Sequence, residues 1–116
     1  MFNFEKLEVW QKAVAFAGLV YRTTRDFPGD ERFGLTNQLR RAAVSIASNI
    51  AEGSARPPAD FSKFLGYATG SVNEVVTQAI IARNERLLSP ADCEKLQQDA
   101  AEISRMLSGL RKSLGE

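Results

Sequence analysis

The stretch NQLRRAAVSIASNIAEGSARPP, residues 37–58, decides the fold because it repeats apolar residues at helical spacing yet holds few residues suited to water. Gly53 is expected to cap the C-terminal end of this helix, and Pro57 and Pro58 prevent it from continuing. A helix that buries only one face carries more charge than this one does. We therefore expect the rest of its surface to meet a partner subunit. Its core stripe, extended back toward the N-terminus, is Leu35, Leu39, Ala42 or Ala43, Ile46 and Ile50.

The same alternation of three- and four-residue steps runs along the rest of the chain and predicts helices at about residues 5–25, 31–52, 58–85 and 90–113. Ser89 is placed to cap the last helix, with Pro90 at its first position. No segment shows the alternation typical of a strand. We therefore predict an all-α fold, with residues 1–116 forming a single domain. Its architecture is predicted to be an up-down-up-down antiparallel four-helix bundle with left-handed crossing.

Two apolar stripes run along the first predicted helix, although a helix in a monomeric bundle needs only one. One stripe is Leu7, Trp10, Val14, Ala17 and Tyr21, and the other is Val9, Ala13, Phe16 and Val20. Surplus apolar surface marks an interface, so we expect the first two helices to form a homo-oligomer contact. The alternative is that the second helix is simply well buried in the bundle. The interface candidates are Val9, Phe16, Val44, Ser45, Ala47, Ser48, Asn49 and Glu52.

Two glycines, Gly66 and Gly70, lie four residues apart on one face of the third predicted helix. Each costs roughly 1 kcal/mol of helix propensity relative to alanine. The close approach of a neighbouring helix or loop is the expected compensation, and a groove for a ligand is the alternative.

Composition argues against an enzyme. Histidine is absent, which removes the commonest general base and the commonest metal ligand. Cys93 is the one cysteine, and it lies on the apolar stripe of the last predicted helix, where core packing is expected rather than reactivity. We therefore expect no cofactor, no metal and no enzymatic activity. No uncharged run approaches the length of a membrane span, and the N-terminus lacks the apolar core of a signal peptide, so a cytoplasmic protein without a membrane partner is expected.

Positive charge gathers on one segment of a nearly neutral chain. Residues 32–56 hold four arginines against Glu52 alone, a net charge of +3 within a total of +1. Clustered basic residues are typical of phosphate binding. Pairing with carboxylates, for instance of Arg41 with Glu52, is the alternative, and no aromatic residue stands between Arg40 and Arg56 to stack on bases. The candidate nucleic-acid ligands are Arg40, Arg41, Arg56 and Lys63.

Four stretches carry a recognisable pattern: FEKLEVWQKA, VYRTTRDFP, ERFGLTNQLRRAAVSIASNIAEGSAR and DFSKFLGYATGSVNEV. Together they resemble the 23S rRNA-intervening-sequence proteins, a family of four-helix bundles, over about residues 4 to 114. The residues that match the family's motifs are Arg40, Arg41, Ser45, Asn49, Glu52 and Gly53 in the second helix and Gly70, Ser71 and Glu74 in the third.

The resemblance implies a ring-like homopentamer with relatives encoded inside inserts of large ribosomal RNA genes. It also implies kinship with a more basic protein that serves diversity-generating retroelements by binding nucleic acid and a reverse transcriptase, whereas this chain is nearly neutral. Two functions stay open: an oligomeric bundle that associates with RNA or a ribonucleoprotein, and an oligomeric scaffold whose partner is a protein. The matched residues are open to both roles, contact between subunits and contact with a ligand.

Overall fold

The structure is a computed structural model that describes residues 1–115. It contains four α-helices, α1 Glu8–Thr24, α2 Leu35–Ser54, α3 Pro58–Asn84 and α4 Pro90–Ser113. Two short 3-10 turns, η1 Asn3–Lys6 and η2 Gly29–Glu31, precede α1 and α2. Because no residue in the described range belongs to a strand, the predicted all-α class is confirmed.

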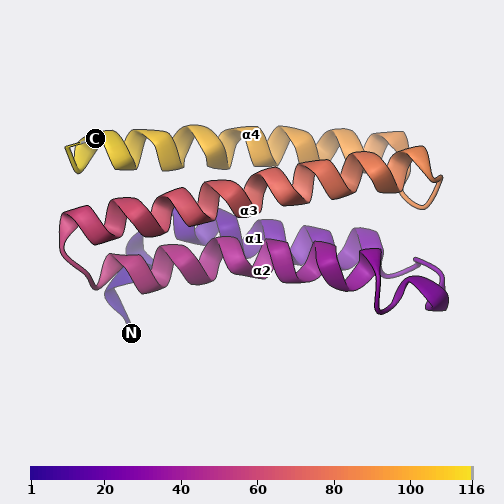
Figure 1. Ribbon diagram of the computed structural model, residues 1–116, viewed down its shortest axis with the longest axis horizontal. Helices are drawn as coiled ribbons and strands as arrows, with labels where there is room; N and C mark the ends of the chain where they lie inside the picture. The colour runs from indigo at the N-terminus through magenta and orange to yellow at the C-terminus, as the bar shows by residue number, and fades with distance from the viewer. Residues whose placement is uncertain (116) are drawn as a thin grey trace.

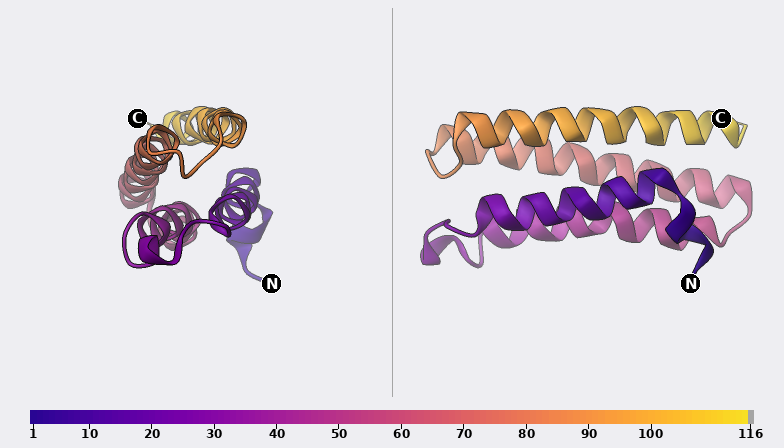
Figure 2. Two further views of the ribbon diagram at one scale, coloured as in Figure 1. Left: turned by 90° about the vertical axis from the view of Figure 1, so that its right-hand side faces the viewer. Right: turned by 180° about the vertical axis from the view of Figure 1, so that it is seen from behind.

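Each helix occupies one corner of an elongated bundle of 43 × 24 × 19 Å (Figure 2). Each also runs back alongside the helix before it, so helices that follow one another in sequence are neighbours in space (Figure 1). The diagonal pairs, α1 with α3 and α2 with α4, make no close backbone approach within residues 1–115. This arrangement agrees with the predicted four-helix bundle, and its left-handed crossing stays a prediction.

Two helices begin later than the sequence pattern predicted. The start expected near residue 5 falls in η1, and the extended backbone of Leu7 (φ −72°, ψ 122°) separates that turn from α1. The start expected near residue 31 falls in η2, and α2 begins only after Gly34. Phe33 therefore lies on the connector and not inside a helix.

One apolar stripe of each helix is buried along the bundle axis. The predicted stripe of α2 is confirmed by Leu39 and Ile46, which are fully buried. The helices α3 and α4 likewise bury Leu65 and Leu96, each at most 1% exposed. On α1 the buried stripe is the second of the two, which includes Val9 and Phe16 at 4% and 2% exposure. This corrects the prediction that placed both residues in a subunit interface, because side chains enclosed by their own bundle offer almost no surface to a second subunit.

The helices α2 and α3 approach each other closely through small residues. The hydroxyl oxygens of Ser45 and Ser71 lie 2.8 Å apart between the two helices. A Cβ atom on Gly53 would lie 2.6 Å from Cβ of Phe64 and 3.0 Å from Cδ1 of Phe61. Gly53 lies inside α2 without a left-handed backbone, so the prediction that it caps the helix is wrong. It is required because its lack of a side chain admits the start of α3.

The two glycines of α3 differ in their surroundings. A Cβ on Gly66 would lie 3.3 Å from Nη1 of Arg111, so the close neighbour there is the tip of a side chain of α4 and not the backbone of a helix or loop as expected. A Cβ on Gly70 would meet nothing within 4 Å among the described residues, and Gly70 is exposed. The packing of this bundle therefore accounts for Gly66 and not for Gly70.

Two predictions about α4 are confirmed. The hydroxyl of Ser89 accepts a hydrogen bond from the backbone N–H of Asp92 at 3.0 Å, with Pro90 in the first turn. Cys93 is fully buried, and its Sγ lies 3.7 Å from the carbonyl oxygen of Ala79. Core packing therefore explains this cysteine.

The close approach of α2 to α3 can be tested by replacing Gly53 with alanine. We expect Gly53→Ala to lower the free energy of unfolding by about 1–2 kcal/mol, because the added methyl group overlaps Phe64 by more than the gain in helix propensity offsets. Gly70→Ala is the matched control and should raise stability by up to about 1 kcal/mol. Urea unfolding followed by circular dichroism at one protein concentration gives both values. Equal stabilisation by the two substitutions would contradict the close packing at Gly53.

Candidate functional site

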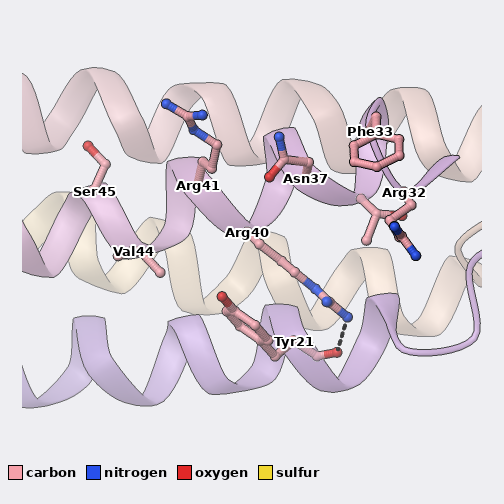
Figure 3. Close-up of a pocket in the computed structure, with 9 residues that line it drawn as sticks. Tyr21, Arg32, Phe33, Asn37, Arg40, Arg41, Val44 and Ser45 are labelled. Carbon is pink, nitrogen blue, oxygen red and sulfur yellow. Dashed lines mark hydrogen bonds between the residues drawn. The ribbon is translucent and has the colours of Figure 1, made fainter.

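A hollow of about 670 Å³, called here the arginine hollow, lies between α1 and α2 beside the first turns of α2 (Figure 3). It contains three arginines and no carboxylate, so its wall is positively charged. Its residues come from the end of α1, the connector before α2 and the first half of α2. They are Tyr21, Arg32, Phe33, Thr36, Asn37, Arg40, Arg41, Val44 and Ser45.

Arg40 reaches from α2 across to α1 and is held there by several contacts (Figure 3). Its Nε donates a hydrogen bond to Oγ1 of Thr24 at 2.9 Å, and its Nη2 donates to the carbonyl oxygen of Tyr21 at 3.5 Å. The guanidinium carbon also lies 4.6 Å from the centre of the Tyr21 ring, where the π-electrons attract a cation. A guanidinium has five N–H groups, so these contacts orient Arg40 and leave further donors available.

Arg41 and Arg32 make fewer contacts within the chain. Arg41 is exposed and points toward the α3 side of α2, away from Arg40 (Figure 3). The guanidinium of Arg32 lies 4.8 Å from the ring centre of Phe33. Among residues 1–115, no carboxylate forms an ion pair with Arg32, Arg40 or Arg41. Three cations around one hollow are therefore without an acidic partner in the described chain.

Arg56 and Lys63 lie beyond the other end of α2 and do not line the arginine hollow. The Nη2 of Arg56 is 3.4 Å from Oε1 of Glu52, so this carboxylate pairs with Arg56 and not with Arg41 as the alternative interpretation held. The structure thus brings together only two of the four predicted nucleic-acid ligands, Arg40 and Arg41. Nucleic-acid binding by any of the four stays a prediction.

Sequence reasoning missed two aromatic members of the arginine hollow. Tyr21 precedes Arg40 by 19 residues, and only the packing of α1 against α2 brings them together. Phe33 is 83% exposed. Its position next to Arg32 in the turn-forming stretch ERFGL was the available signal. Aromatic rings are therefore close to these arginines in space, although none stands between Arg40 and Arg56 in sequence.

Two of the interface candidates, Ser45 and Asn49, find polar partners inside the chain. The Nδ2 of Asn49 donates to the carbonyl oxygen of Ser45 at 2.8 Å and to its hydroxyl at 3.1 Å. The same hydroxyl meets Ser71 on α3. A second subunit is therefore not needed to satisfy these groups. A place for them in a subunit contact stays a prediction.

A second hollow, the apolar groove, continues along the same two helices. It has a volume of about 400 Å³ and is lined by Phe4, Trp10, Val14, Ala17, Val44, Ala47, Ser48 and Ala51. Val14 and Val44 are 45% and 44% exposed. Here the stripe of α1 that is left out of the core meets the outer face of α2. Val44 lines both hollows, so the apolar groove and the arginine hollow adjoin.

Comparison with known proteins gives a family. The sequence matches the family model described as 23S rRNA-intervening sequence protein over residues 5–109. The chain belongs to this family. The resemblance found in the sequence is thereby confirmed.

A crystal structure supports the fold of this 23S rRNA-intervening sequence protein. It is that of a protein of unknown function from the S23 ribosomal protein family of Bacteroides thetaiotaomicron. The two chains are 24% identical and superpose with a TM-score of 0.82, over 90% of this chain and 95% of the other. None of the curated proteins matches the sequence.

The described part of this family member lacks two further features, a membrane-spanning helix and a cluster of metal ligands. Within residues 1–115, no helix combines the length and the apolar character that crossing a membrane requires. The same residues hold no group of three or more Cys, Asp and Glu side chains arranged to bind a metal ion.

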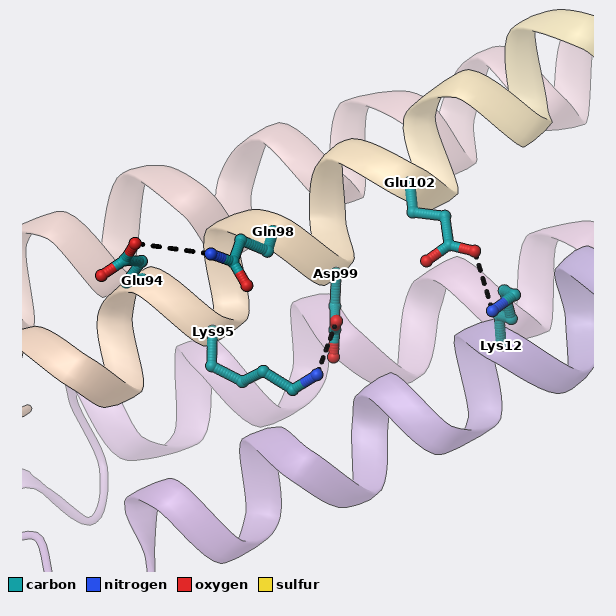
Figure 4. A network of polar contacts seen from close by, with 6 residues as sticks. All are labelled: Lys12, Glu94, Lys95, Gln98, Asp99 and Glu102. Carbon is teal, nitrogen blue, oxygen red and sulfur yellow. Dashed lines mark hydrogen bonds and ion pairs between the residues drawn. The ribbon is translucent and has the colours of Figure 1, made fainter.

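A third hollow of this family member lies between α1 and α4, and four of its five charged side chains form ion pairs (Figure 4). Nζ of Lys12 on α1 lies 2.8 Å from Oε1 of Glu102 on α4. Nζ of Lys95 lies 3.1 Å from Oδ1 of Asp99, one turn along α4. These two lysines and two carboxylates pair with one another, and Arg22 is the one further charged side chain in the lining, so this hollow has less unpaired positive charge than the arginine hollow. Lys12 and Glu102 instead link two helices.

The ion pair between Lys12 and Glu102 shifts the pKa of both side chains. The hydrogen bond from Lys12, and then the attraction of its charge, lower the pKa of the Glu102 carboxyl below its ordinary 4.5. The same two contacts raise the pKa of Lys12 above 10.5. The stabilisation from Glu102 is therefore fully present above pH 4.5 and is lost as the pH falls through the lowered pKa. The stabilisation from Lys12 is fully present below pH 10.5 and is lost as the pH rises through the raised pKa of the amine.

This linkage predicts a pH-dependent effect of Glu102→Gln. We expect the variant to be slightly less stable than the wild type at neutral pH, because the pair is partly exposed and such pairs contribute little. The difference should vanish in acid, where the wild-type carboxyl is neutral as well. Thermal unfolding across the pH range measures both. Glu94→Gln is the control, since Glu94 accepts only a hydrogen bond from Gln98 at 3.4 Å (Figure 4). A difference that persists at low pH would contradict the assignment.

Proposed function

We propose that this chain is a non-enzymatic, homo-oligomeric protein that associates with RNA through the arginine hollow. The observation that supports it most is the grouping of Arg32, Arg40 and Arg41 around one hollow, without a carboxylate partner in residues 1–115. Guanidinium groups match phosphate oxygens because they donate two parallel hydrogen bonds. A concave, unpaired group of them is suited to the backbone of a nucleic acid.

Family membership makes RNA the first ligand to test, since the family takes its name from the intervening sequences of 23S rRNA. The charge distribution agrees with this choice. Residues 32–56 carry +3, whereas the whole chain carries +1, so the attraction for phosphates is concentrated on one segment of the chain.

Homo-oligomerisation is the second part of the proposal, and the apolar groove supports it. The groove leaves Val14 and Val44 nearly half exposed on neighbouring helices. Covering them with a second copy of the chain would remove apolar surface from water. A ring of five copies, the assembly that the sequence resemblance implied, would present five arginine hollows. Weak single sites would then act together on one RNA molecule.

We assign no catalytic role to the chain. It contains no histidine, and its one cysteine is fully buried. The partly exposed carboxylates of α4 that line a hollow, Asp99 and Glu102, are paired with lysines. The chemistry that these side chains offer is recognition by charge and shape.

The apolar groove also favours a second candidate function, an oligomeric scaffold whose partner is a protein. In that case the arginines would satisfy carboxylates across an interface, and Arg41→Ala would lower the mass of the assembly. In the RNA-associated case Arg41→Ala would leave the mass unchanged and weaken only RNA binding. Sedimentation of the variant therefore separates the two functions.

The RNA-binding prediction concerns Arg41, which forms no ion pair within residues 1–115 and is exposed. We expect Arg41→Ala to weaken binding to a fluorescein-labelled RNA hairpin roughly tenfold, equivalent to about 1.4 kcal/mol, because it removes a phosphate contact. It should also reduce the slope of log affinity against log salt by about one. Fluorescence anisotropy at several salt concentrations measures both quantities.

The matched control is Arg105→Ala, an exposed arginine on α4, a helix whose backbone makes no close approach to α2 within residues 1–115. It should change neither affinity nor slope. Equal losses in the two variants would point to general charge attraction and remove the assignment to the hollow. No binding of RNA by the wild type at low salt would overturn the function itself.

The assembly prediction compares two aliphatic side chains of nearly equal exposure, one inside the apolar groove and one outside it. Val14 in the apolar groove is 45% exposed, and Ile81 on α3 is 46% exposed. We expect Val14→Glu to shift the protein toward the 12.8 kDa monomer, because it places a charge in an apolar contact. Ile81→Glu should leave the mass unchanged. Sedimentation velocity measures the mass of each variant. A Val14→Glu variant that sediments like the wild type would argue against this interface.

A further inference from the structure

We infer that the arginine hollow binds an unpaired nucleotide of RNA, with the base stacked on Phe33 and the phosphates held by Arg40 and Arg41. This inference rests on the proposed association with RNA and adds the form of RNA that the hollow recognises. It is drawn from the two exposed aromatic residues that the fold places among the arginines.

Phe33 has the position and exposure of a stacking platform. Its ring is 83% exposed and lies on the connector between η2 and α2, where no helix covers it. One contact of the ring is with Arg32, whose guanidinium lies 4.8 Å from the ring centre. A flat ring held beside cations offers a π-surface to any base, since every base has a π-face.

Arg40 supplies a phosphate donor that is already oriented. Its hydrogen bonds to Thr24 and Tyr21 fix the side chain across the gap between α2 and α1. The Thr24 hydroxyl is itself fixed, because it donates to the carbonyl oxygen of Val20 at 2.8 Å. Little side-chain freedom is therefore lost when a ligand binds, which favours affinity.

The opposite side of the hollow adds a second cation and a neutral polar group. Arg41 and Asn37 both point to the α3 side of α2, in neighbouring turns (Figure 3). Both are exposed. An asparagine amide carries donors and an acceptor, so it can pair with the edge of a base that an aromatic ring holds in place.

Double-stranded RNA fits these features less well. In an A-form helix the bases are stacked on one another, and the deep, narrow major groove excludes side chains. Phe33 would then face no base, and only the arginines would contribute. A loop, a bulge or a single strand leaves bases free to stack. The volume of about 670 Å³ also falls within the range of roughly 300–1,000 Å³ that is typical of ligand pockets.

The test compares three fluorescein-labelled RNAs: a single strand, the same strand paired with its complement, and a strand of the same length that carries no bases, called here the base-free strand. We expect the wild type to bind the single strand most tightly. Phe33→Leu keeps an apolar side chain and removes the ring, so it should weaken single-strand binding about five- to hundred-fold. It should leave the duplex, the base-free strand and the slope against salt unchanged.

The control variant is Phe2→Leu, because Phe2 is 69% exposed but stacks on Phe4, 5.5 Å between ring centres, and does not line the hollow. Its affinity for the single strand should equal that of the wild type. Equal affinity of the wild type for single strand and duplex, or an unchanged affinity in Phe33→Leu, overturns this inference and leaves the proposed RNA association standing. Failure of the wild type to bind any of the three RNAs overturns both.

Discussion

The close approach of α2 to α3 determines what the rest of α2 displays. The Ser45 and Ser71 hydroxyls meet between the two helices, and Gly53 admits Phe64 where any side chain would collide. These contacts fix the rotation of α2 about its own axis. Since successive residues of a helix are about 100° apart, a change of one residue in that rotation would carry Arg40 away from Tyr21. The position of Arg40 beside α1 therefore depends on small residues on the α3 side of the helix.

Most of the fold could be predicted from the sequence because α2, α3 and α4 each carry one dominant apolar stripe. The exception is instructive. On α1 the stripe with Trp10 and Val14 and the stripe with Val9 and Phe16 are equally regular, and periodicity alone cannot choose between them. The choice depends on how α1 packs between α2 and α4, which is a property of the assembled bundle. The surplus apolar surface was predicted on the right two helices, but on α1 the residues left outside are those of the other stripe.

The candidate site was predictable only in part, for the same kind of reason. A count of charges located the basic segment, since charge is a local property of the sequence. It could not tell that Arg40 and Arg41, adjacent in sequence, point to opposite sides of α2, or that Glu52 pairs with Arg56. Nor could a count of charges place the ring of Tyr21 against the guanidinium of Arg40, because that contact joins two helices. Position on a helix surface decides which neighbours share a site, and tertiary packing sets that position.

The single tryptophan of the chain gives the apolar groove an optical signal of its own. Trp10 lies in the wall of the groove and meets Phe4 edge to face, with 5.1 Å between the ring centres. Indole emission moves to shorter wavelength when water leaves the ring. The colour of the fluorescence of the unlabelled protein therefore reports whether the groove is open or covered. Diluting the protein while recording its emission spectrum would follow the proposed assembly directly, without a tag, a dye or a substitution.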